Sequence, residues 1–535
     1  MTDIIFVNQF DLEISEEQVL PLGLLSLSQV LKEEGLTAKI CDFNGLYYQG
    51  KLEFSASYQV NMERMVDYLA KFDPIIVSFY TMANNYHVAL SLCEQLKKQH
   101  PRVITIFAGP QATAVAVETL KCFPQVDLIA IGEGELTVGP IVRHLKKNGL
   151  CNLKDVDGIA FRFDQQVVVT EAKSHWIDVD KLPILDFSQI DNHSNRNINV
   201  LEMELGRGCP FNCTYCSTSR FWGRNYRVKS IDRVIYEIKE YQRQFGTKIF
   251  LFQHDLFTFD KKYVLELCNR VLKENLQIKW ACYARLDVID EEMIRSMAKA
   301  GCIKLFFGLE TGSPKIQDAV KKHLDVDKIF LLLDVLAECN VRITISFIYG
   351  FPQEEYHDLR QTLTLMYRIK DKSYTLCSSK KWVDVFISML MYFANTQITD
   401  DFFDSLVFDE TYFEATNKLH FLPSEVITTI KKHKKVFPQY YVMPKLKGKK
   451  HRYLSGFINA MFSSFFYAEH DLVSDIMQAY SGDVLALYLN IYEEYPEAVE
   501  KIYHCFYDEA NEIGVMPLLY EILTKLKCLC RDGGG

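Results

Sequence analysis

The sequence predicts an α/β protein in three parts: a doubly wound Rossmann-like sheet, a partial (β/α)6 barrel and a mainly helical C-terminal part. Short β-branched runs alternate with helical patterns over the first ~150 residues, as in a parallel sheet. The alternation returns between Val200 and Ile398 with about six strand–helix units, too few for a closed eight-unit barrel. Strand signals are few in the remaining chain. The predicted boundaries are 1–150, a linker over 151–198, 199–400 and 401–535.

The N-terminal part alternates strands and helices in a regular order. Apolar residues two apart favour a strand, whereas a spacing of three to four favours a helix. A doubly wound sheet binds ligands beyond the carboxyl ends of its strands, here at the loops Tyr80–Tyr86, Gly109–Thr113 and Gly132–Glu135. The expected strands are Ile4–Asn8, Ala38–Asp42, Ile75–Phe79, Val103–Ala108 and Leu128–Ile131, and the expected helices include Leu22–Glu34, Met62–Lys71 and Val88–Gln99.

The linker is expected to hold a hairpin at Gly158–Thr170 and a Pro-containing connector at Trp176–Phe187. In the barrel that follows, chemistry should lie at the carboxyl ends of the strands. The Phe- and Tyr-rich C-terminal part favours a helical cap. The expected barrel strands are Leu201–Leu205, Ile249–Gln253, Lys279–Tyr283, Lys304–Gly308, Arg342–Ile348 and Val383–Leu390, and the helices Ile231–Phe245, Lys261–Glu274, Glu291–Lys299, Ser313–Lys321 and Val326–Glu338.

Composition and charge narrow the functional class. The 535 residues carry a formal charge of −9, whereas nucleic-acid binders are usually basic, so nucleic acid is not an expected partner. No signal peptide or membrane-spanning run is visible, and a cytoplasmic protein is expected. The stretch Lys431–Arg452 has nine Lys or Arg residues and no acid. We expect a solvated loop there, broken by Pro438 and Pro444, with an anion-binding surface as the alternative.

Fifteen cysteines in so long a chain do not indicate a disulfide framework. Three of them, Cys209, Cys213 and Cys216, follow the Gly-rich end of a predicted strand and could surround one metal centre. Thiolates hold iron–sulfur clusters, and three ligands on a four-iron cluster leave one iron open. Structural zinc is the alternative, and it would need a fourth ligand such as Cys268 or Cys282. Cys505, Cys528 and Cys530 form a weaker candidate for an auxiliary cluster.

The spacing Cys-x-x-x-Cys-x-x-Cys, with Tyr215 before the last cysteine, resembles the signature of the radical SAM superfamily. Further segments resemble that family in the same order: Asp255-Leu256-Phe257-Thr258, Ala284-Arg285-Leu286-Asp287, Gly308-Leu309-Glu310-Thr311-Gly312-Ser313 and Gly350-Phe351-Pro352-Gln353-Glu354. The N-terminal part is similar to the cobalamin-binding domain fused to one branch of the superfamily. His254, Gln353 and Ala394-Asn395-Thr396 depart from the family pattern, which leaves substrate and subclass open.

The resemblance implies that Cys209, Cys213 and Cys216 hold a [4Fe–4S] cluster and that S-adenosylmethionine binds its open iron. A reduced cluster would cleave that sulfonium to methionine and a 5′-deoxyadenosyl radical, chemistry that belongs to the cofactor. Glu310 is expected to accept hydrogen bonds from the ribose; a helix-start carboxylate is the alternative. Arg285 would pair with the methionine carboxylate or form an ordinary ion pair. The residues implied for S-adenosylmethionine are Tyr215, Asp255, Arg285, Glu310, Gly350 and Phe351.

Cobalamin is the third cofactor that the resemblance implies, and an empty Rossmann-like domain is the alternative. The Asp-x-His-x-x-Gly motif is absent, and His87, His100 and His144 are expected to be ordinary helix residues. The loops also lack Gly-x-Gly-x-x-Gly, which disfavours a nicotinamide site. The residues expected at the corrin or its tail are Gly109, Pro110, Gln111, Thr113, Gly132 and Glu133.

The resemblance therefore implies a cobalamin-dependent methyltransferase acting on an unactivated carbon of a small-molecule or peptide substrate. A one-electron donor such as flavodoxin or ferredoxin would reduce the cluster. A radical cyclase or rearrangement enzyme is the second reading, and a non-catalytic cobalamin or iron–sulfur sensor is the third. Methylthiolation is disfavoured because the N-terminal part has no three-cysteine motif of its own.

Overall fold

The computed structural model describes residues 2–8, 20–55, 57–171, 176–190, 200–377, 381–411, 422–507 and 512–532. Its N-terminal sheet has seven strands in the order β2-β1-β3-β4-β5-β6-β7. The first five run parallel, and β6 and β7 are antiparallel to their neighbours. The strands are β1 (Ile4–Asn8), β2 (Ala38–Asp42), β3 (Ile76–Tyr80), β4 (Ile104–Ala108), β5 (Leu128–Ala130), β6 (Ile159–Phe163) and β7 (Gln166–Val169).

Helices cover both faces of this sheet, which confirms the doubly wound prediction. Successive side chains of a strand point to opposite faces. Accordingly Ile4 and Phe6 join the core under α1 and α7, while Ile5 and Val7 join the core under α3 and α4. The helices are α1 (Leu22–Glu33), α2 (Phe43–Tyr48), α3 (Tyr58–Ala70), α4 (Tyr86–Gln99), α5 (Pro110–Ala114), α6 (Ala116–Cys122) and α7 (Val138–Asn148).

The hairpin expected inside the linker is instead part of the N-terminal sheet. Strand β6 pairs antiparallel with β5, and β7 follows at the sheet edge. Without the hairpin, the three-residue strand β5 would leave an unpaired edge. Ile159 and Phe161 of β6 bury their side chains in one core and Ala160 in the other, so β6 continues the layers of the domain.

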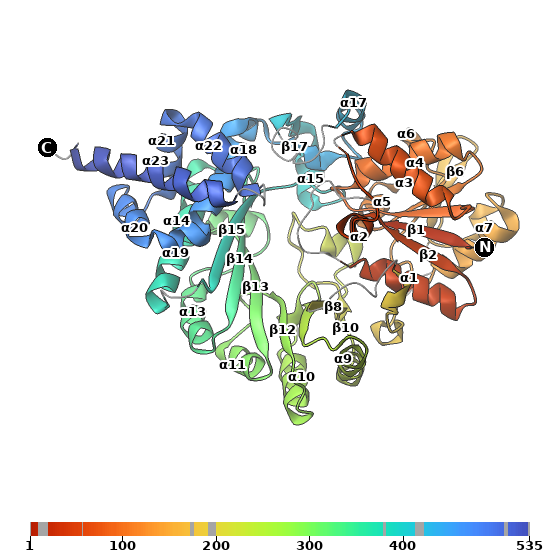
Figure 1. Ribbon diagram of the computed structural model, residues 1–535, viewed down its shortest axis with the longest axis horizontal. Coiled ribbons are helices and arrows are strands. Elements are labelled where there is room, and N and C mark those ends of the chain that lie inside the picture. The colour runs from red at the N-terminus through yellow and green to blue at the C-terminus, as the bar shows by residue number, and fades with distance from the viewer. Residues whose placement is uncertain are drawn as a thin grey trace.

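The second sheet has six parallel strands in the order β15-β14-β13-β12-β11-β8, and it is open between β15 and β8, as a partial barrel requires. Figure 1 shows this sheet in green beside the red and orange N-terminal sheet. Its strands are β8 (Val200–Glu204), β11 (Ile249–Gln253), β12 (Lys279–Ala284), β13 (Cys302–Glu310), β14 (Arg342–Tyr349) and β15 (Val383–Met389). The helices are α8 (Thr218–Phe221), α9 (Ile231–Phe245), α10 (Lys261–Lys273), α11 (Glu291–Lys299), α12 (Pro314–Ala319), α13 (Lys328–Glu338) and α14 (Tyr356–Leu376).

The C-terminal part is mainly helical, as expected, and it protects the free edge of β15. The amide of Asn459 on α18 accepts from the Ile387 N–H at 2.8 Å and donates to the Ile387 carbonyl at 3.0 Å. None of the helices in the described ranges is long and apolar enough to cross a membrane. The elements are α15 (Gln397–Phe402), β16 (Val407–Phe408), α17 (Ser424–Lys432), β17 (Tyr441–Val442), α18 (Lys449–Ala460), α19 (Phe466–Ala468), α20 (His470–Ala479), α21 (Val484–Glu494), α22 (Pro496–Tyr507) and α23 (Glu512–Asp532).

The basic stretch Lys431–Arg452 is not a solvated loop, so that expectation was wrong. Val436, Phe437 and Tyr440 are buried in the core shared with α4 of the N-terminal domain. The Tyr440 hydroxyl lies 2.9 Å from Nδ1 of His87. Figure 1 shows α17 and β17 next to the N-terminal domain and apart from the blue helices α20 and α23. The segment can bury its apolar residues despite its many lysines, because the lysine ammonium groups can remain in water while the segment packs.

Candidate active site at the facing ends of the two sheets

The three-cysteine loop begins where β8 ends, and two close backbone approaches shape it. Gly206 and Arg207 form the short strand β9, which pairs antiparallel with β10 (Arg227–Val228). Gly208 has φ +88°, and a Cβ there would collide with the Asn225 carbonyl oxygen. Glycine is therefore required at position 208 for two reasons: the backbone is left-handed, and there is no space for a Cβ. Cys209, Cys213 and Cys216 are half-buried and carry free thiols.

Asp255, at the carboxyl end of β11, fixes this loop on both sides of its cysteines. Its Oδ2 accepts from the Gly208 N–H at 2.7 Å, and its Oδ1 accepts from the Thr218 hydroxyl at 3.2 Å. Burial raises the pKa of Asp255 above its ordinary value, and these two hydrogen bonds partly offset that shift. Asp255 thus contacts the loop itself in the structure.

His254 occupies a position where the family pattern has an acid, and its side chain forms hydrogen bonds with the backbone nearby. Its Nδ1 accepts from the Leu256 N–H at 2.8 Å, which leaves Nε2 to donate to the Arg227 carbonyl at 3.2 Å. Burial lowers the pKa of His254 to about 4, so the ring is neutral at neutral pH. The imidazole therefore supplies shape and hydrogen bonds to the loop rather than charge.

Arg285 brings a positive charge to the cysteine loop from the carboxyl end of β12. Its Nη1 lies 3.8 Å from the Cys213 sulfur, and its guanidinium stacks 3.7 Å from the centre of the Phe211 ring. Its Nε forms an ion pair with Asp287 at 2.7 Å, so the ordinary ion pair considered from the sequence is present. The structure thus places a guanidinium directly beside the sulfur of Cys213.

Burial acts against ionisation of the other two thiols. It raises the pKa of Cys209 to about 11 and also raises the pKa of Cys216. Iron would have to displace these protons, as in any thiolate site. Three half-buried thiols in one loop, with Arg285 beside Cys213, fit an iron–sulfur cluster that keeps one iron open.

Glu310 ends β13 in a left-handed conformation, with φ +66°. Its Oε1 pairs with Nζ of Lys322 at 2.6 Å, and the same Nζ lies 3.2 Å from the Tyr215 hydroxyl. Ser313 caps helix α12, so Glu310 is not the helix-start carboxylate considered above. Lys322 follows α12 and carried no sequence signal. The carboxylate is thereby held next to the loop that contains Tyr215.

Gly350 and Phe351 form the turn after β14. Gly350 has φ +92°, and its N–H donates to Oε2 of Glu354 at 2.5 Å. The Phe351 ring is fully buried and meets the Tyr215 ring edge-on at 6.0 Å between centroids. Burial raises the pKa of Glu354 to about 7. The segment predicted to bind S-adenosylmethionine therefore packs directly against the cysteine loop.

A mainly apolar cavity of about 270 Å³ opens at the carboxyl ends of the N-terminal strands. Four of the residues predicted to contact cobalamin, Gly109, Pro110, Gly132 and Glu133, line it. Its deeper wall comes from the sheet and from helices α1 and α7, and it includes Ile4, Phe6, Leu24, Leu27, Ile106, Val138 and Ile141. Small residues at the mouth and an apolar interior fit a planar, uncharged ring, such as the base that ends the cobalamin tail, better than a charged group.

Gln111 and Thr113 were expected in this crevice, but both side chains are used elsewhere. The buried Gln111 amide donates to the Val436 carbonyl at 2.8 Å, and so binds the C-terminal segment. The Thr113 hydroxyl accepts from the Gly132 N–H at 3.1 Å and fixes the neighbouring loop. Neither residue lines the cavity.

A second cavity of about 420 Å³ lies at the carboxyl ends of β8, β11 and β12. It shares four residues with the first cavity, namely Gly23, Glu204, Arg207 and Trp222. Its polar wall includes Gln253, His254, Asp255 and Tyr283. The crevice of the N-terminal sheet and the mouth of the barrel therefore adjoin through a common wall.

The zinc alternative lacks its fourth ligand. Cys268 and Cys282 are buried beside Cys302 in the barrel core. Among the described side chains, no group of three or more His, Cys, Asp or Glu converges closely enough to hold a single metal ion. Of the weaker cysteine candidates, Cys528 is exposed, and the Cys530 side chain lies outside the described residues.

Two family models match the chain, one in the N-terminal domain and one in the barrel. The B12 binding domain matches residues 14–142, and the radical SAM superfamily matches residues 203–366. An uncharacterized methyltransferase of Pyrococcus horikoshii is 29% identical over 345 residues, which cover 64% of this chain and 72% of that protein. An anaerobic magnesium-protoporphyrin IX monomethyl ester cyclase of Cereibacter sphaeroides is 25% identical over 57% of this chain, and the match spans about half of its own length (51%).

Solved structures share the fold across all three parts. The cobalamin-dependent S-adenosylmethionine radical enzyme OxsB, with aqua-cobalamin bound, matches 99% of this chain and 81% of its own with a TM-score of 0.66 at 15% identity. The methyltransferase TsrM of Kitasatospora setae matches 76% of this chain and 75% of its own with a TM-score of 0.59 at 13% identity. The chain therefore combines a B12 binding domain with a domain of the radical SAM superfamily, and these two domains imply cobalamin, a [4Fe–4S] cluster and S-adenosylmethionine as cofactors.

Proposed function

We propose that this chain is a methyltransferase that transfers a methyl group from S-adenosylmethionine to an unactivated carbon of a small-molecule or peptide substrate. One observation carries the proposal. The apolar cavity of the N-terminal sheet and the cavity at the barrel mouth share a wall made by Gly23, Glu204, Arg207 and Trp222. A corrin over the first cavity would adjoin the second, which is lined by Asp255, the residue that binds the Gly208 N–H at the start of the cluster loop.

Each site residue has a proposed task. Cys209, Cys213 and Cys216 hold the cluster, whose bound S-adenosylmethionine supplies the radical chemistry. Asp255 holds the loop that carries them. Glu310 receives the ribose hydroxyls, and Gly350 and Phe351 pack the adenine. Gly109, Pro110, Gly132 and Glu133 form the mouth of the cobalamin cavity.

A radical cyclase is the second candidate, because magnesium-protoporphyrin cyclases stand among the relatives beside methyltransferases. Both candidates need the same cluster and the same radical, so the site residues above do not separate them. The product mass does, since methylation adds one methyl group and ring closure does not. A methyl-deuterated S-adenosylmethionine would mark the product only in the first case.

The test is anaerobic reconstitution of the full chain with iron, sulfide and hydroxocobalamin, followed by S-adenosylmethionine. Reduction is supplied either by dithionite or by a flavodoxin or ferredoxin system, the class of donor that we propose. We expect about four irons per chain, retained cobalamin and release of 5′-deoxyadenosine. The variant Cys213→Ala should lose deoxyadenosine release, while Cys151→Ala, at an exposed thiol outside the site, should not. Deoxyadenosine release by Cys213→Ala at the wild-type rate would reject the proposal.

A further inference from the structure

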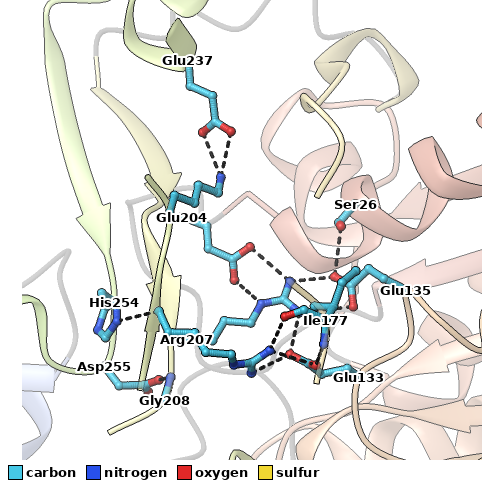
Figure 2. Close-up of polar contacts among 12 residues, drawn as sticks. Ser26, Glu133, Glu135, Ile177, Glu204, Arg207, Gly208, Glu237, His254 and Asp255 are labelled. Atoms are coloured by element: carbon cyan, nitrogen blue, oxygen red, sulfur yellow. Dashed lines mark hydrogen bonds and ion pairs between the residues drawn. The ribbon is translucent and has the colours of Figure 1, made fainter. Parts of the chain in front are cut away.

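The wall between the two cavities is built around one buried guanidinium, that of Arg207. Figure 2 shows it between the Glu133–Glu135 loop of the N-terminal domain and Glu204 of the barrel. Arg207 pairs with Glu204 at 2.6 Å, with Glu135 at 2.6 Å and with Glu133 at 3.1 Å. Only 6% of the Arg207 side chain is exposed. One side chain of the barrel thus binds two carboxylates of the other domain.

A second arginine of the barrel reinforces the contact. Arg227, on the strand paired with β9, binds Glu133 at 2.8 Å and donates to the Ile177 carbonyl at 2.9 Å. The Ile177 N–H in turn donates to Glu133 at 3.0 Å, and the Ser26 hydroxyl donates to Glu135 at 3.0 Å. Figure 2 shows these contacts as one continuous network.

Glu135 and Arg207 stabilise each other's charged forms. Burial alone would raise the pKa of Glu135, but the Arg207 guanidinium holds it below its ordinary value. Burial also opposes the charge on Arg207, yet Glu204 and Glu135 raise its pKa well above the ordinary value. A planar guanidinium can meet several carboxylates at set angles, which the ammonium of a lysine cannot do.

The position of Arg207 in the chain connects this network to the cluster loop. Gly208 and Cys209 follow directly, so the backbone that carries Arg207 continues into the cluster loop. Glu133, which was expected to touch cobalamin, lines the first cavity while its carboxylate faces the two arginines. Any shift of the Glu133–Glu135 loop would therefore be transmitted to the cluster loop over one residue.

We propose that Arg207 is a positioning residue that sets the cobalamin-binding domain against the cluster loop, through Glu133 and Glu135. The inference rests on the proposed function in so far as cobalamin must face the barrel mouth. The network holds the mouth of the cobalamin cavity and the start of the cysteine loop in one arrangement. Weakening it should loosen both at once, although the mutated side chain binds neither cluster nor S-adenosylmethionine.

The chain contains a matched control for this test. Glu237 (Figure 2) is also buried, and it forms ion pairs with Lys229 at 2.9 Å and with Arg233 at 2.5 Å, both of which belong to the first unit of the barrel. Glu135→Gln and Glu237→Gln each remove one buried carboxylate charge. Only the first lies between the domains, so a general loss of stability should affect both variants and a positioning effect only one.

Two measurements on the full chain test the proposal. Hydrogen–deuterium exchange without cofactors should speed up at least tenfold in residues 206–216 of Glu135→Gln and remain near wild type in Glu237→Gln. Titration with hydroxocobalamin, followed by absorbance, should give a dissociation constant raised about ten- to a hundredfold in Glu135→Gln and in Arg207→Lys, but not in Glu237→Gln.

The outcomes separate this inference from the proposed function. Unchanged exchange in residues 206–216 of Glu135→Gln, or equal losses of hydroxocobalamin affinity in Glu135→Gln and Glu237→Gln, would overturn the positioning role. A wild-type chain that binds no hydroxocobalamin would overturn the proposed function, and the exchange of residues 206–216 would then decide the inference by itself. If Arg207→Lys does not fold, Glu135→Gln carries both measurements.

Discussion

Replacing Glu310 by glutamine tests the ribose contact, because it keeps the shape of the side chain and removes its charge. The carboxylate ends β13 beside the cysteine loop and pairs with Lys322 at 2.6 Å, with 9% and 8% of the two side chains exposed. Breaking a buried ion pair on one side costs about 3–5 kcal/mol. We expect about 3 kcal/mol here, because the glutamine oxygen can still accept from Lys322.

The effect on S-adenosylmethionine should be separate from the loss of stability. Hydrogen bonds to a charged acceptor contribute about 1.5–3 kcal/mol each. In Glu310→Gln the two ribose hydroxyls would face one neutral amide oxygen instead of a carboxylate. The binding free energy of S-adenosylmethionine should therefore weaken by about 2 kcal/mol, which raises the dissociation constant about thirtyfold. Anaerobic calorimetric titration of the reconstituted protein measures this constant, and urea unfolding measures the stability.

Lys322→Met is the matched control, because it breaks the same ion pair but keeps the carboxylate. It should lower the free energy of unfolding by a similar amount and leave S-adenosylmethionine affinity unchanged or higher, since the ribose would then be the main donor to Glu310. Wild-type affinity in Glu310→Gln, or equal weakening in both variants, would refute the ribose role.

Three further variants test Asp255, Glu354 and Gln111. Asp255→Asn should lose the bond from Gly208 to a charged acceptor, about 1.5–3 kcal/mol, and reduce the iron retained after reconstitution at least twofold; full iron content would contradict this. Burial raises the pKa of Glu354 from 4.5 to about 7. Its contribution to the free energy of unfolding should therefore fall by about 3 kcal/mol as the pH rises from about 4.5 to 7. Urea unfolding at pH 5 and pH 8 should show this fall in the wild type and not in Glu354→Gln. Gln111→Ala should cost about 1–3 kcal/mol, because the buried Val436 carbonyl loses its donor, while hydroxocobalamin affinity stays at the wild-type value.

The local features of the site were predictable from the sequence because strand ends are local. Apolar runs placed β11, β12 and β13 to within a few residues, and a parallel sheet brings their carboxyl ends to one edge. Asp255, Arg285 and Glu310 therefore lie around the cysteine loop, as the motif order indicated. The spacing of the cysteines was likewise visible without any tertiary information.

Contacts between distant segments were not predictable in the same way. Gln111 and Val436 are 325 residues apart, and a glutamine in a crevice loop gives no sign that a C-terminal carbonyl is its partner. Glu133 sits in a loop typical of cobalamin domains, yet its charge is taken by Arg207 and Arg227. The sequence of the basic stretch around Val436 predicts a loop, because its many lysines obscure the apolar residues that pack in the structure.

One anaerobic absorption spectrum of the full chain, reconstituted with iron, sulfide and hydroxocobalamin and then desalted, tests the central claim most directly. We predict cluster charge-transfer bands together with corrin bands, at about four irons and one cobalamin per chain. The Cys213→Ala variant should lose the cluster bands and keep the corrin bands. A wild-type spectrum without corrin bands, or cluster bands unchanged in Cys213→Ala, would contradict the account.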